Sequence, residues 1–438
     1  MKKVMYGLFI GLFLTMSLAL SVGMIFAGPA QPTANEILAE APVLKNEDGT
    51  ANTDVLSQTA AWINDRFFLR NELIGIDRKL TAGVLNTSGQ SSVILGSDGW
   101  LYFTPTLPDY TGTEGMTERE LSNAAHNLSL MARYCEENGK QFLLVIAPNK
   151  NALYSDNMPS YGVKAEITDA QKLHALLEQK GVPYADLFAA FGAEEEVLYF
   201  AHDSHWNSKG AALGADVINS GFGRESNYFA GDFSKTQPHE GDLYAMLYPG
   251  STDPEQDVIY GGQLQFEFTG RATKADAISL ETAGQGSGKL LAYRDSFGNL
   301  LYPYLADSFA AATFSRSTAY DLTKEGDFVL VELVQRNLRY LITYIPVMPS
   351  PMADICPAVS QGTLDAKTAK KGELLQVTGT LPDEADHVYV VTSNGVYEAF
   401  LLADNGYAAN IPADSTATQI IYTIGDRSQM YELTIGGK

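Results

Sequence analysis

The chain has 438 residues, of which 45% are hydrophobic, and a formal net charge of −22 at pH 7. This length suits two or three domains with a large apolar core. A nucleic-acid-binding surface needs clustered Lys and Arg, so the acidic balance argues against a DNA or RNA partner. The same charge favours neutral or amino-sugar polymers over strongly anionic ones as ligands.

The first 30 residues are expected to be an export segment that lies outside the fold. Lys2 and Lys3 precede an uncharged apolar run over residues 4–27, and a positive end before such a run marks its cytoplasmic side. The run is long enough to span a bilayer and ends without a small-x-small cleavage site. These features favour an uncleaved membrane anchor over a cleaved signal peptide. In either case the remaining chain is predicted to be extracytoplasmic.

The two cysteines are open to two interpretations. An extracytoplasmic compartment permits a disulfide between Cys135 and Cys356. Cys135 also continues the apolar series of Leu121 and Leu128 on an expected helix. This pattern favours a buried thiol over a bridge.

Residues 31–88 are expected to form a linker and a helical lead-in around INDRFFLRNEL, and residues 89–350 the main domain. Helices are expected at 118–138 and 168–181, each opened by a capping box, and from Ser208 onward. Strands that are apolar on both faces alternate with these helices, which predicts a mostly parallel sheet covered on both sides, a three-layer α/β/α fold. The expected strands are QFLLVIAP (141–148), VPYADLF (182–188), EVLYF (196–200), GKLLAYRDS (288–296) and DFVLVELV (327–334).

Residues 360–438 change to a period-two pattern. About six or seven short strands, separated by turn residues, predict a small antiparallel all-β sandwich. If its tyrosines are exposed, they can stack on sugar rings and the unit can bind carbohydrate. Strands normally bury their aromatic residues, so a structural or interaction domain is favoured. The tyrosines concerned are Tyr389, Tyr397, Tyr407 and Tyr422.

Chemistry-bearing residues collect in FAHDSHWNSKG (200–210) and YRDSFGN (293–299). In an open parallel sheet, reactive groups gather on the loops that leave the carboxyl ends of strands, and both segments follow expected strands. Asp203 and His205 are two residues apart, so an extended segment would project both to one side, roughly 7 Å apart at the backbone. Ser296 stands at a strand-to-helix turn, where free backbone N–H groups can hold an oxyanion. The three are a candidate orienter, base and nucleophile.

Each of these residues also has another interpretation. A Ser at a helix start is often a cap, and an Asp-x-His pair is a common loop hydrogen bond. Metal binding is a further alternative, although the histidine spacing matches no zinc pattern. The candidate metal ligands are His202, Asp203, His205 and His239. Trp206 is expected to pack beside the loop, and Asn207 or Ser208 to cap the next helix.

The segments DSHWN and RDSFG together resemble the DHHW family and the related alginate O-acetyltransferases, exported proteins with an SGNH-hydrolase-like fold. Further segments are similar and follow in order: INDRFFLRNEL, GSDGWLYF, APNKNALY, GDLYAML and VELVQRNL. The resemblance spans residues 60–345. It implies acetyl transfer to hydroxyls of an extracytoplasmic polysaccharide. By this resemblance Ser296 is the acyl-accepting nucleophile, His205 the base and Asp203 its orienter.

Two features depart from the family pattern. The chain has Asp203-Ser204-His205-Trp206 where the family name has Asp-His-His-Trp, so the middle histidine is absent. The trio is expected to survive this change. The serine block reads Arg-Asp-Ser in place of the Gly-Asp-Ser of ordinary SGNH esterases, and Asp-x-His precedes the serine. This order suggests a circularly permuted arrangement of the same geometry.

The sequence defines substrate contacts less closely. Asn149, Asn207 and Asn299 are asparagines that can serve an oxyanion hole or, equally, a turn or a cap. Arg294 can face a sugar carboxylate or phosphate, or pair with Asp295. The candidate substrate-binding residues are Arg294, Asn149, Asn207, Asn299 and Trp206.

The predicted function is that of an extracytoplasmic polysaccharide O-acetyltransferase with an acetyl-serine intermediate. No Gly-rich loop for a coenzyme A donor is visible, so no cofactor is expected, and the resemblance implies a membrane-bound O-acyltransferase as the acetyl source. The same trio serves an esterase if water replaces the sugar. A non-catalytic exopolysaccharide-binding or assembly protein on this scaffold is the competing class, and a metal-dependent deacetylase is a third.

Overall fold

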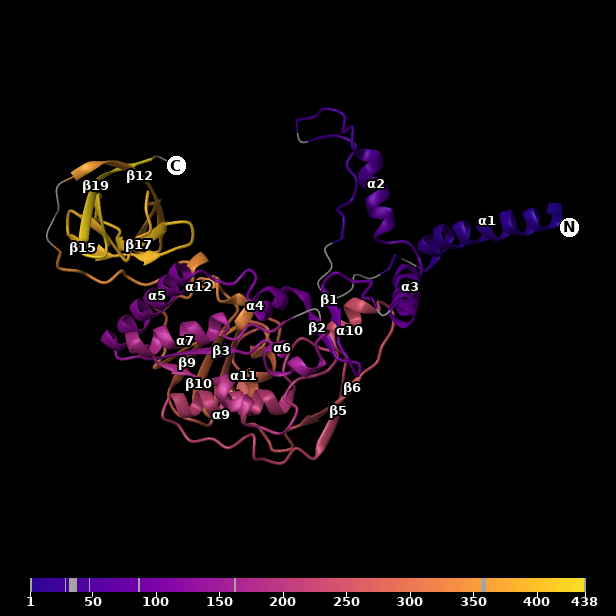
Figure 1. Cartoon of the computed structure of the whole chain (residues 1–438), viewed down its shortest axis with the longest axis horizontal. Helices are drawn as coiled ribbons and strands as arrows, with labels where there is room; N and C mark the ends of the chain where they lie inside the picture. The colour runs from indigo at the N-terminus through magenta and orange to yellow at the C-terminus, as the bar shows by residue number, and fades with distance from the viewer. Residues whose placement is uncertain are drawn as a thin grey trace.

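The computed structural model describes residues 2–27, 29–30, 38–46, 48–85, 87–160, 163–355 and 360–436. The chain forms an α/β body with the C-terminal strands at one end and helix α1 (Lys2–Phe26) projecting from the other (Figure 1). Cys135 is fully buried and forms no disulfide with any residue in these ranges. Cys356 lies outside the described residues, so the alternative of a bridge between the two stays a prediction.

Seven strands form the central sheet of the body. They are β3 (Gln141–Ala147), β4 (Tyr184–Ala185), β7 (Phe266–Phe268), β8 (Ser279–Gly284), β9 (Lys289–Tyr293), β10 (Ala311–Ser315) and β11 (Phe328–Val334). Their order is β4-β3-β11-β9-β10-β8-β7, with parallel pairing from β4 to β10 and antiparallel pairing of β8 with β10 and β7. The predicted mostly parallel sheet is confirmed. Because parallel strands end at a common edge, the segments after β3, β9 and β11 lie close together.

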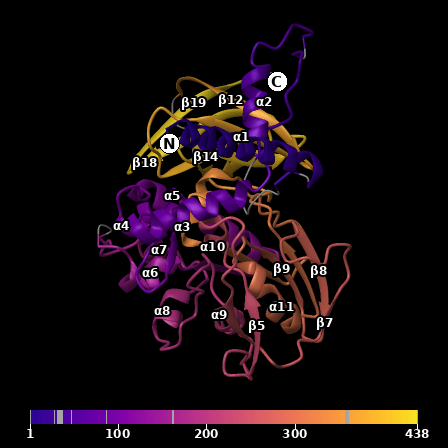
Figure 2. The ribbon, with the colours of Figure 1, turned by 90° about the vertical axis from the view of Figure 1, so that its right-hand side faces the viewer.

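Helices cover both faces of this sheet. The helices of the body are α4 (Leu107–Thr111), α5 (Glu118–Glu137), α6 (Lys150–Leu153), α7 (Asp169–Lys180), α8 (Leu187–Gly192), α9 (Ser208–Gly221), α10 (Asp242–Leu247), α11 (Gly298–Ser308) and α12 (Tyr340–Thr343). α5, α7 and α12 pack on one face, and α8, α9 and α11 pack on the other (Figures 1 and 2). Alternate residues of β3 enter opposite cores, Leu144 the first and Val145 the second. The predicted three-layer α/β/α architecture is therefore confirmed.

The helix boundaries follow their sequence signals. Thr117 and Glu120 form a complete capping box at the start of α5, and Thr168 and Gln171 form another at the start of α7. α7 ends at Gly181, whose φ of 64° lies in the left-handed region that glycine adopts without steric cost.

Residues 196–200 do not form a strand, so that prediction is wrong. Only an isolated antiparallel bridge joins Tyr199 to Trp206, while Leu198 and Tyr199 pack into the second core. A short apolar run satisfies core packing without joining the sheet, and periodicity alone does not separate the two cases. Two further hairpins also lie outside the central sheet: β1 (Val93–Leu95) with β2 (Leu101–Phe103), and β5 (Lys235–His239) with β6 (Glu255–Ile259).

The C-terminal strands form one eight-stranded sheet that curls around its own core (Figure 1). They are β12 (Ser360–Lys371), β13 (Leu374–Thr380), β14 (His387–Thr392), β15 (Gly395–Glu398), β16 (Phe400–Leu401), β17 (Gly406–Pro412), β18 (Ala417–Ile424) and β19 (Arg427–Ile435). The all-β prediction is confirmed, but β12 runs parallel to β19, so the pairing is not purely antiparallel.

Three of the four candidate sugar-stacking tyrosines are buried in this sheet. Tyr397, Tyr407 and Tyr422 belong to its hydrophobic core, and only Tyr389 is half-buried. Their rings face inward because strands place alternate side chains on the core side. The packing interpretation therefore holds for these three, and sugar stacking by them is ruled out.

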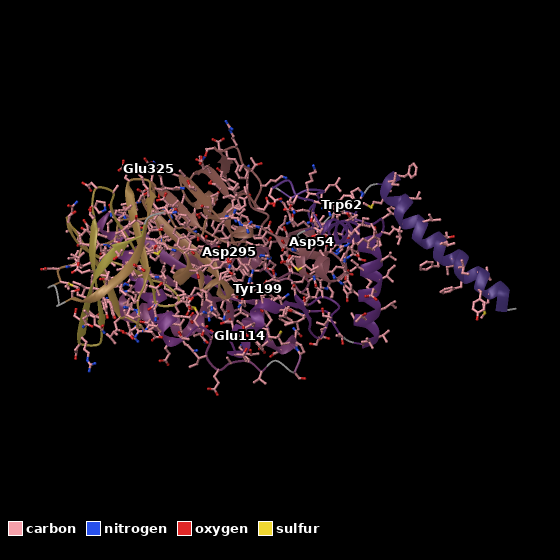
Figure 3. The ribbon with its side chains drawn as sticks, turned by 90° about the horizontal axis from the view of Figure 1, so that it is seen from above. Asp54, Trp62, Glu114, Tyr199, Asp295 and Glu325 are labelled. Carbon is pink, nitrogen blue, oxygen red and sulfur yellow. The ribbon has the colours of Figure 1, made fainter. Side chains whose placement is uncertain are left out.

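The N-terminal helices lie apart from the sheet. Among the described residues, α1 is the one helix long and apolar enough to cross a membrane, and none of its apolar window is buried (Figure 3). The lead-in divides into α2 (Val55–Asn64) and α3 (Arg70–Leu85), separated at Leu69, whose φ is 62°. α3 approaches the body at Gly75, where a Cβ would lie 2.5 Å from the Pro249 carbonyl oxygen.

One buried asparagine joins the body to the C-terminal sheet. Asn127 of α5 donates to the carbonyl oxygens of Leu341 and Leu401 at 2.9 and 2.8 Å, and it accepts from the Leu401 N–H at 2.8 Å. The neighbouring Phe400 enters the first core of the body. Asn127 is 1% exposed, so water does not replace these bonds when the side chain is removed.

We therefore expect Asn127→Ala to lower the free energy of unfolding by about 2 kcal/mol, because it leaves buried backbone groups without partners. Urea denaturation followed by intrinsic fluorescence measures the change. Asn138→Ala, at the exposed end of α5, is the matched control and should cost less than about 1 kcal/mol. An equal loss of unfolding free energy in the two variants would contradict the proposed role of Asn127 in joining the body to the C-terminal sheet.

Candidate active site

Ser296 stands in the turn between β9 and α11, as the sequence predicts. Asp295 fixes this turn, because its Oδ1 accepts from the Phe297 N–H at 2.9 Å and its Oδ2 accepts from the Val334 N–H at 2.8 Å. Gly298 is required in the turn, since a Cβ there would lie 2.4 Å from a buried arginine side chain. The serine hydroxyl is thus presented at the carboxyl edge of the sheet.

A bent loop over residues 200–205 crosses the same edge, closed by the bridge between its flanking residues. Lys150, which follows β3, is buried beneath the loop and donates three hydrogen bonds to it. The acceptors are the carbonyl oxygens of Phe200, Ala201 and Asp203, at 3.0, 2.9 and 2.6 Å. Burial lowers the pKa of Lys150 to about 7, whereas three carbonyl acceptors favour the protonated amine. Lys150 therefore holds the loop in its bent conformation by bonding its backbone from the buried side.

The loop and the turn meet in a hydrogen-bonded series. Nε2 of His205 lies 2.8 Å from Oγ of Ser296, and Nδ1 lies 2.7 Å from Oδ1 of Asp203. The same carboxylate oxygen accepts from the His205 N–H at 2.9 Å. The two side chains thus meet through a bend and not through the extended segment that was predicted. In this order a serine hydroxyl can pass its proton to the imidazole, while the carboxylate stabilises the imidazolium.

Asp203 is a buried carboxylate with four donors. Besides the two from His205, its Oδ2 accepts from Nε2 of His239 at 2.9 Å and from the Asp242 N–H at 3.0 Å. Burial alone would raise the carboxyl pKa, but the bonds from the two histidines hold the pKa of Asp203 well below its usual range. Burial also opposes the charge on His205, yet Asp203 raises the pKa of His205 above its ordinary value of 6.5.

Two residues that the sequence analysis did not place in the trio complete its surroundings. His239, at the end of β5, stacks on Phe200 with ring centroids 3.8 Å apart. Asp242, at the start of α10, accepts from the N–H and Oγ of Ser204 at 2.8 and 2.7 Å. By its residue type His239 was predicted only as a metal-ligand candidate, and nothing in the sequence marked Asp242. Both lie more than thirty residues along the chain from Asp203, so no local spacing signals their contact with it.

The structure corrects the candidate ligand contact at Arg294, which is buried and instead bonds Asn299, another candidate. Arg294 is 5% exposed, and its guanidinium donates to Oδ1 of Asn299 at 2.7 Å and to the Ala275 carbonyl oxygen at 2.6 Å. It also bonds the backbone carbonyl of Asp295 at 3.2 Å, and no ion pair joins the two side chains in the described structure. These two residues brace the turn behind the serine.

Trp206, Asn207 and Asn149 are also held within the protein. Trp206 is fully buried, and its indole N–H donates to the Phe297 carbonyl oxygen at 3.0 Å. Asn207 caps α9, accepting from the Gly210 N–H at 3.0 Å. Asn149 is 1% exposed, with its Nδ2 3.3 Å from a carboxylate oxygen of Asp109. The predictions that Trp206 packs beside the loop and that Asn207 caps the next helix are therefore confirmed.

The donor chemistry does not favour the metal alternative. His202 turns away from the other ligands, with Nδ1 3.2 Å from the Asp253 carbonyl oxygen. Ligand atoms of Asp203, His205 and Asp242 lie within 4.8 Å of one another, but both ring nitrogens of His205 are already hydrogen-bonded. A metal ion at these atoms would have to displace a member of the hydrogen-bonded series.

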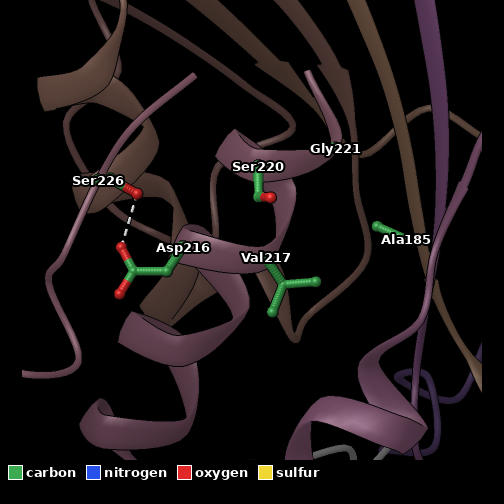
Figure 4. Close-up of a pocket in the computed structure, with 6 residues that line it drawn as sticks. All are labelled: Ala185, Asp216, Val217, Ser220, Gly221 and Ser226. Carbon is green, nitrogen blue, oxygen red and sulfur yellow. Dashed lines mark hydrogen bonds between the residues drawn. The ribbon is translucent and has the colours of Figure 1, made fainter. Parts of the chain in front are cut away.

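A separate hollow of about 480 Å³ lies along the C-terminal half of α9 (Figure 4). Its carboxylate is used internally, since Oδ1 of Asp216 accepts from Oγ of Ser226 at 2.6 Å and from the Tyr228 N–H at 2.9 Å. The loop that carries His205 precedes the other end of this helix. The hollow is therefore distinct from the candidate site.

Residues 93–261 match the family model described as SGNH hydrolase-like domain, acetyltransferase AlgX. The matched segment contains Asp203 and His205 and ends before Ser296. No curated protein matches the chain significantly. The resemblance to the DHHW and alginate O-acetyltransferase proteins is thus confirmed over the matched segment, and its SGNH-hydrolase-like fold agrees with the α/β/α layers.

Several solved structures are similar to the chain at low identity. The O-acetyltransferase domain of Pseudomonas putida AlgJ is 19% identical, over 56% of this chain and 92% of that chain, with a TM-score of 0.37. Bacillus cereus PatB1 with a sulfonyl adduct is 17% identical, over 56% and 97%, with a TM-score of 0.41. A DHHW family protein from Eubacterium siraeum is 15% identical, over 52% and 90%, with a TM-score of 0.39.

Because the buried Lys150 satisfies three carbonyl oxygens, we expect Lys150→Met to lower the free energy of unfolding by about 3 kcal/mol. Chemical denaturation measures this change. Lys164→Met is the control, since Lys164 is exposed and bonds one carbonyl oxygen, that of Ala152, at 2.8 Å. Its cost should stay below about 0.5 kcal/mol. Similar losses from both lysines would refute the internal role of Lys150.

We expect the imidazole of His205 to titrate above pH 6.5 and its pKa to fall in Asp203→Asn, because the raised value depends on the Asp203 charge. NMR titration of the ring signals measures both values. The pKa of His205 in the folded state lies above its ordinary value of 6.5. The bond with Asp203 therefore stabilises the fold fully below pH 6.5, and this stabilisation is lost as the pH rises through the raised pKa of His205.

Asp48→Asn, which removes an exposed carboxylate of the lead-in, is the control for this titration and should leave the His205 pKa unchanged. An unchanged His205 pKa in Asp203→Asn would show that the hydrogen bond between them is not formed in solution.

Proposed function

We propose, from the premise that residues 93–261 match an SGNH hydrolase-like acetyltransferase domain, that the chain is an extracytoplasmic polysaccharide O-acetyltransferase. The observation that carries this proposal is the hydrogen-bonded series from Oγ of Ser296 through His205 to Asp203. In it Ser296 is the nucleophile, His205 the general base and acid, and Asp203 the residue that orients the imidazole.

In the first step, Oγ of Ser296 attacks the carbonyl carbon of an acetyl donor while Nε2 of His205 takes the hydroxyl proton. The resulting tetrahedral intermediate collapses, and the bond from the acetyl carbon to the donor's leaving group breaks. His205 returns the proton to that leaving group. The products are an acetyl ester on Ser296 and the deacetylated donor.

The backbone of the nucleophile turn supports the oxyanion formed in this step. Among the described residues none accepts a hydrogen bond from the Ser296 N–H, which stands just before α11. The Phe297 N–H is not available, because Asp295 accepts from it at 2.9 Å. We assign the first oxyanion donor to the Ser296 N–H, since a free backbone N–H at such a turn stabilises developing negative charge.

In the second step a sugar hydroxyl replaces the leaving group. Nε2 of His205 takes the hydroxyl proton, and the sugar oxygen attacks the acetyl carbon of acetyl-Ser296. The bond to Oγ then breaks, and His205 returns the proton to Ser296. The product is an acetylated sugar, whereas water in the same position would release acetate and make the enzyme an esterase.

The proposed setting follows from the N-terminal helix. α1 has the length and apolar content of a membrane span, and we propose that it anchors the enzyme at the outer face of the membrane. There, a membrane-bound O-acyltransferase is the proposed source of the acetyl group. This arrangement places the glycan, the donor and Ser296 in one compartment.

The test is intact-mass spectrometry of the full chain after exposure to p-nitrophenyl acetate. We expect one added acetyl group on the wild type and none on Ser296→Ala, with nitrophenol release reduced at least about 10³-fold in this variant and in His205→Ala. Acetylated oligosaccharides formed when glycan oligomers are added would favour transfer over hydrolysis.

Ser204→Ala is the matched control, because Oγ of Ser204 lies 3.3 Å from Nδ1 of His205, whereas Ser296 bonds Nε2. This variant should keep the acetyl adduct. If the wild type acquires no adduct and releases no nitrophenol, the proposed enzyme function fails. A non-catalytic polysaccharide-binding protein then becomes the better reading of the fold.

A further inference from the structure

Arg336 lies next to the candidate site on a turn that is fixed to the nucleophile. It belongs to the 3-10 turn Gln335–Asn337 directly after β11. Oδ2 of Asp295 accepts from Val334 at 2.8 Å and from Nδ2 of Asn337 at 3.0 Å, so the residue before Ser296 holds both ends of this turn. The position of Arg336 relative to the serine is therefore set by one shared carboxylate.

The guanidinium of Arg336 contacts two aromatic rings. Its central carbon is 5.4 Å from the ring centroid of Phe103 and 5.5 Å from that of Phe297. Phe297 follows Ser296 in sequence, and its ring centroid is 4.8 Å from that of His205. These two cation–π contacts hold the guanidinium in place. They use none of its N–H donors, which can therefore bind oxygen atoms.

Within the part of the chain that the structure describes, Arg336 has no hydrogen bond and no ion pair, although its guanidinium carries five N–H donors. The guanidinium of the neighbouring Arg339, in contrast, has partners: it pairs with Glu120 and donates to the Gly115 carbonyl oxygen. Arg336 is half-buried, and unpaired polar groups in such positions are costly unless a ligand or water completes them. A ligand with oxygen acceptors would complete them.

The surrounding charges indicate an uncharged ligand. Burial lowers the pKa of Arg336, and the negative charges of Asp295 and Asp242 oppose this lowering. Both carboxylates already accept hydrogen bonds from other residues. The guanidinium is therefore not an isolated positive charge. It can act as a fork of donors toward neutral oxygen atoms such as sugar hydroxyls.

A small cavity of about 160 Å³ lies against Arg336. Its walls include Pro105, Pro108 and Gln335, together with the carboxyl groups of Asp109, Glu114 and Asp169. Arg339 also lines it, and its charge is paired with Glu120. Burial and the nearby Asp169 raise the pKa of Asp109 to about 7, so near neutral pH this carboxyl group can either donate to or accept from a hydroxyl. Three carboxyl groups disfavour an anionic ligand and suit a hydroxyl-rich one.

We propose that Arg336 and this cavity form the subsite for an uncharged sugar unit of the acceptor polysaccharide, with the guanidinium donating hydrogen bonds to its oxygen atoms. The proposal rests on the proposed acetyltransferase function and names its substrate class. Binding at this subsite holds the acceptor chain at the edge of the sheet where acetyl-Ser296 forms.

Calorimetric titration of the full chain carrying Ser296→Ala tests this subsite without requiring turnover. The uncharged probes are cellopentaose and chitopentaose, and the anionic probe is a galacturonate pentamer. We expect at least one uncharged probe to bind and the anionic probe to bind at least about 10-fold more weakly. The additional substitution Arg336→Gln should lower the affinity for the uncharged probe by about 10- to 100-fold, because hydrogen bonds from a charged donor are lost.

Two variants make the test specific. Arg336→Lys keeps the charge but not the donor fork, so it should also weaken binding at least about 5-fold. Arg271→Gln removes an exposed guanidinium and should leave the affinity within about 2-fold. Circular dichroism of each variant checks that it is folded.

The proposal is overturned if neither uncharged probe binds, if folded Arg336→Gln binds as tightly as the parent, or if the anionic probe binds best. A missing acetyl adduct on the wild type would instead refute the proposed enzyme function. That result would leave a positive binding titration standing as evidence for a glycan site.

Discussion

Burial of the Asp203 carboxylate is the constraint on which the candidate site depends. A carboxylate removed from water stays ionised only when donors replace its hydration. Here the donors come from His205 in the same loop, from His239 at the end of β5 and from the backbone at the start of α10. The charge that sets the basicity of His205 therefore requires the whole segment from the loop to α10 to fold together.

The sheet edge supplies the second requirement, which is proximity. β3, β9 and β11 are parallel neighbours, so Lys150, Ser296 and Arg336 follow strands that end side by side. Each has a different role in the geometry: Lys150 supports the loop from below, Ser296 meets His205, and Arg336 presents free donors beside them. A parallel sheet places such groups together without any of them being close in sequence.

Local signals in the sequence predicted local structure well. The capping boxes at Thr117 and Thr168 gave the correct starts of α5 and α7, because the bonds involved span only three residues. The Asp-x-His spacing predicted the contact between Asp203 and His205 for the same reason, although a bend and not a strand produces it. The predicted strand at 196–200 was wrong because an apolar run does not show whether it joins a sheet.

Roles that depend on the direction of a side chain were not accessible from one sequence. Arg294 was a candidate to face a ligand or to pair with Asp295, yet its guanidinium bonds Asn299 behind the serine turn. Arg336, which was not singled out, has the free guanidinium. Both are arginines beside strand ends, and only the packing around each separates them. His239 was a metal-ligand candidate by residue type, and the fold placed its ring on Asp203.

By itself the sequence determined the class of fold, the exported character expected of the chain and the identity of the three residues in the hydrogen-bonded series. The first two follow from apolar periodicity and from the charged and apolar order of the N-terminus. Asp203 and His205 follow from a short spacing, and Ser296, 91 residues from His205, follows from its place after a strand and from the family resemblance. The tertiary structure decided which polar groups surround Asp203, which asparagines and arginines are structural, and where free donors remain. Those outcomes depend on contacts between segments tens of residues apart, whose energies no local pattern encodes.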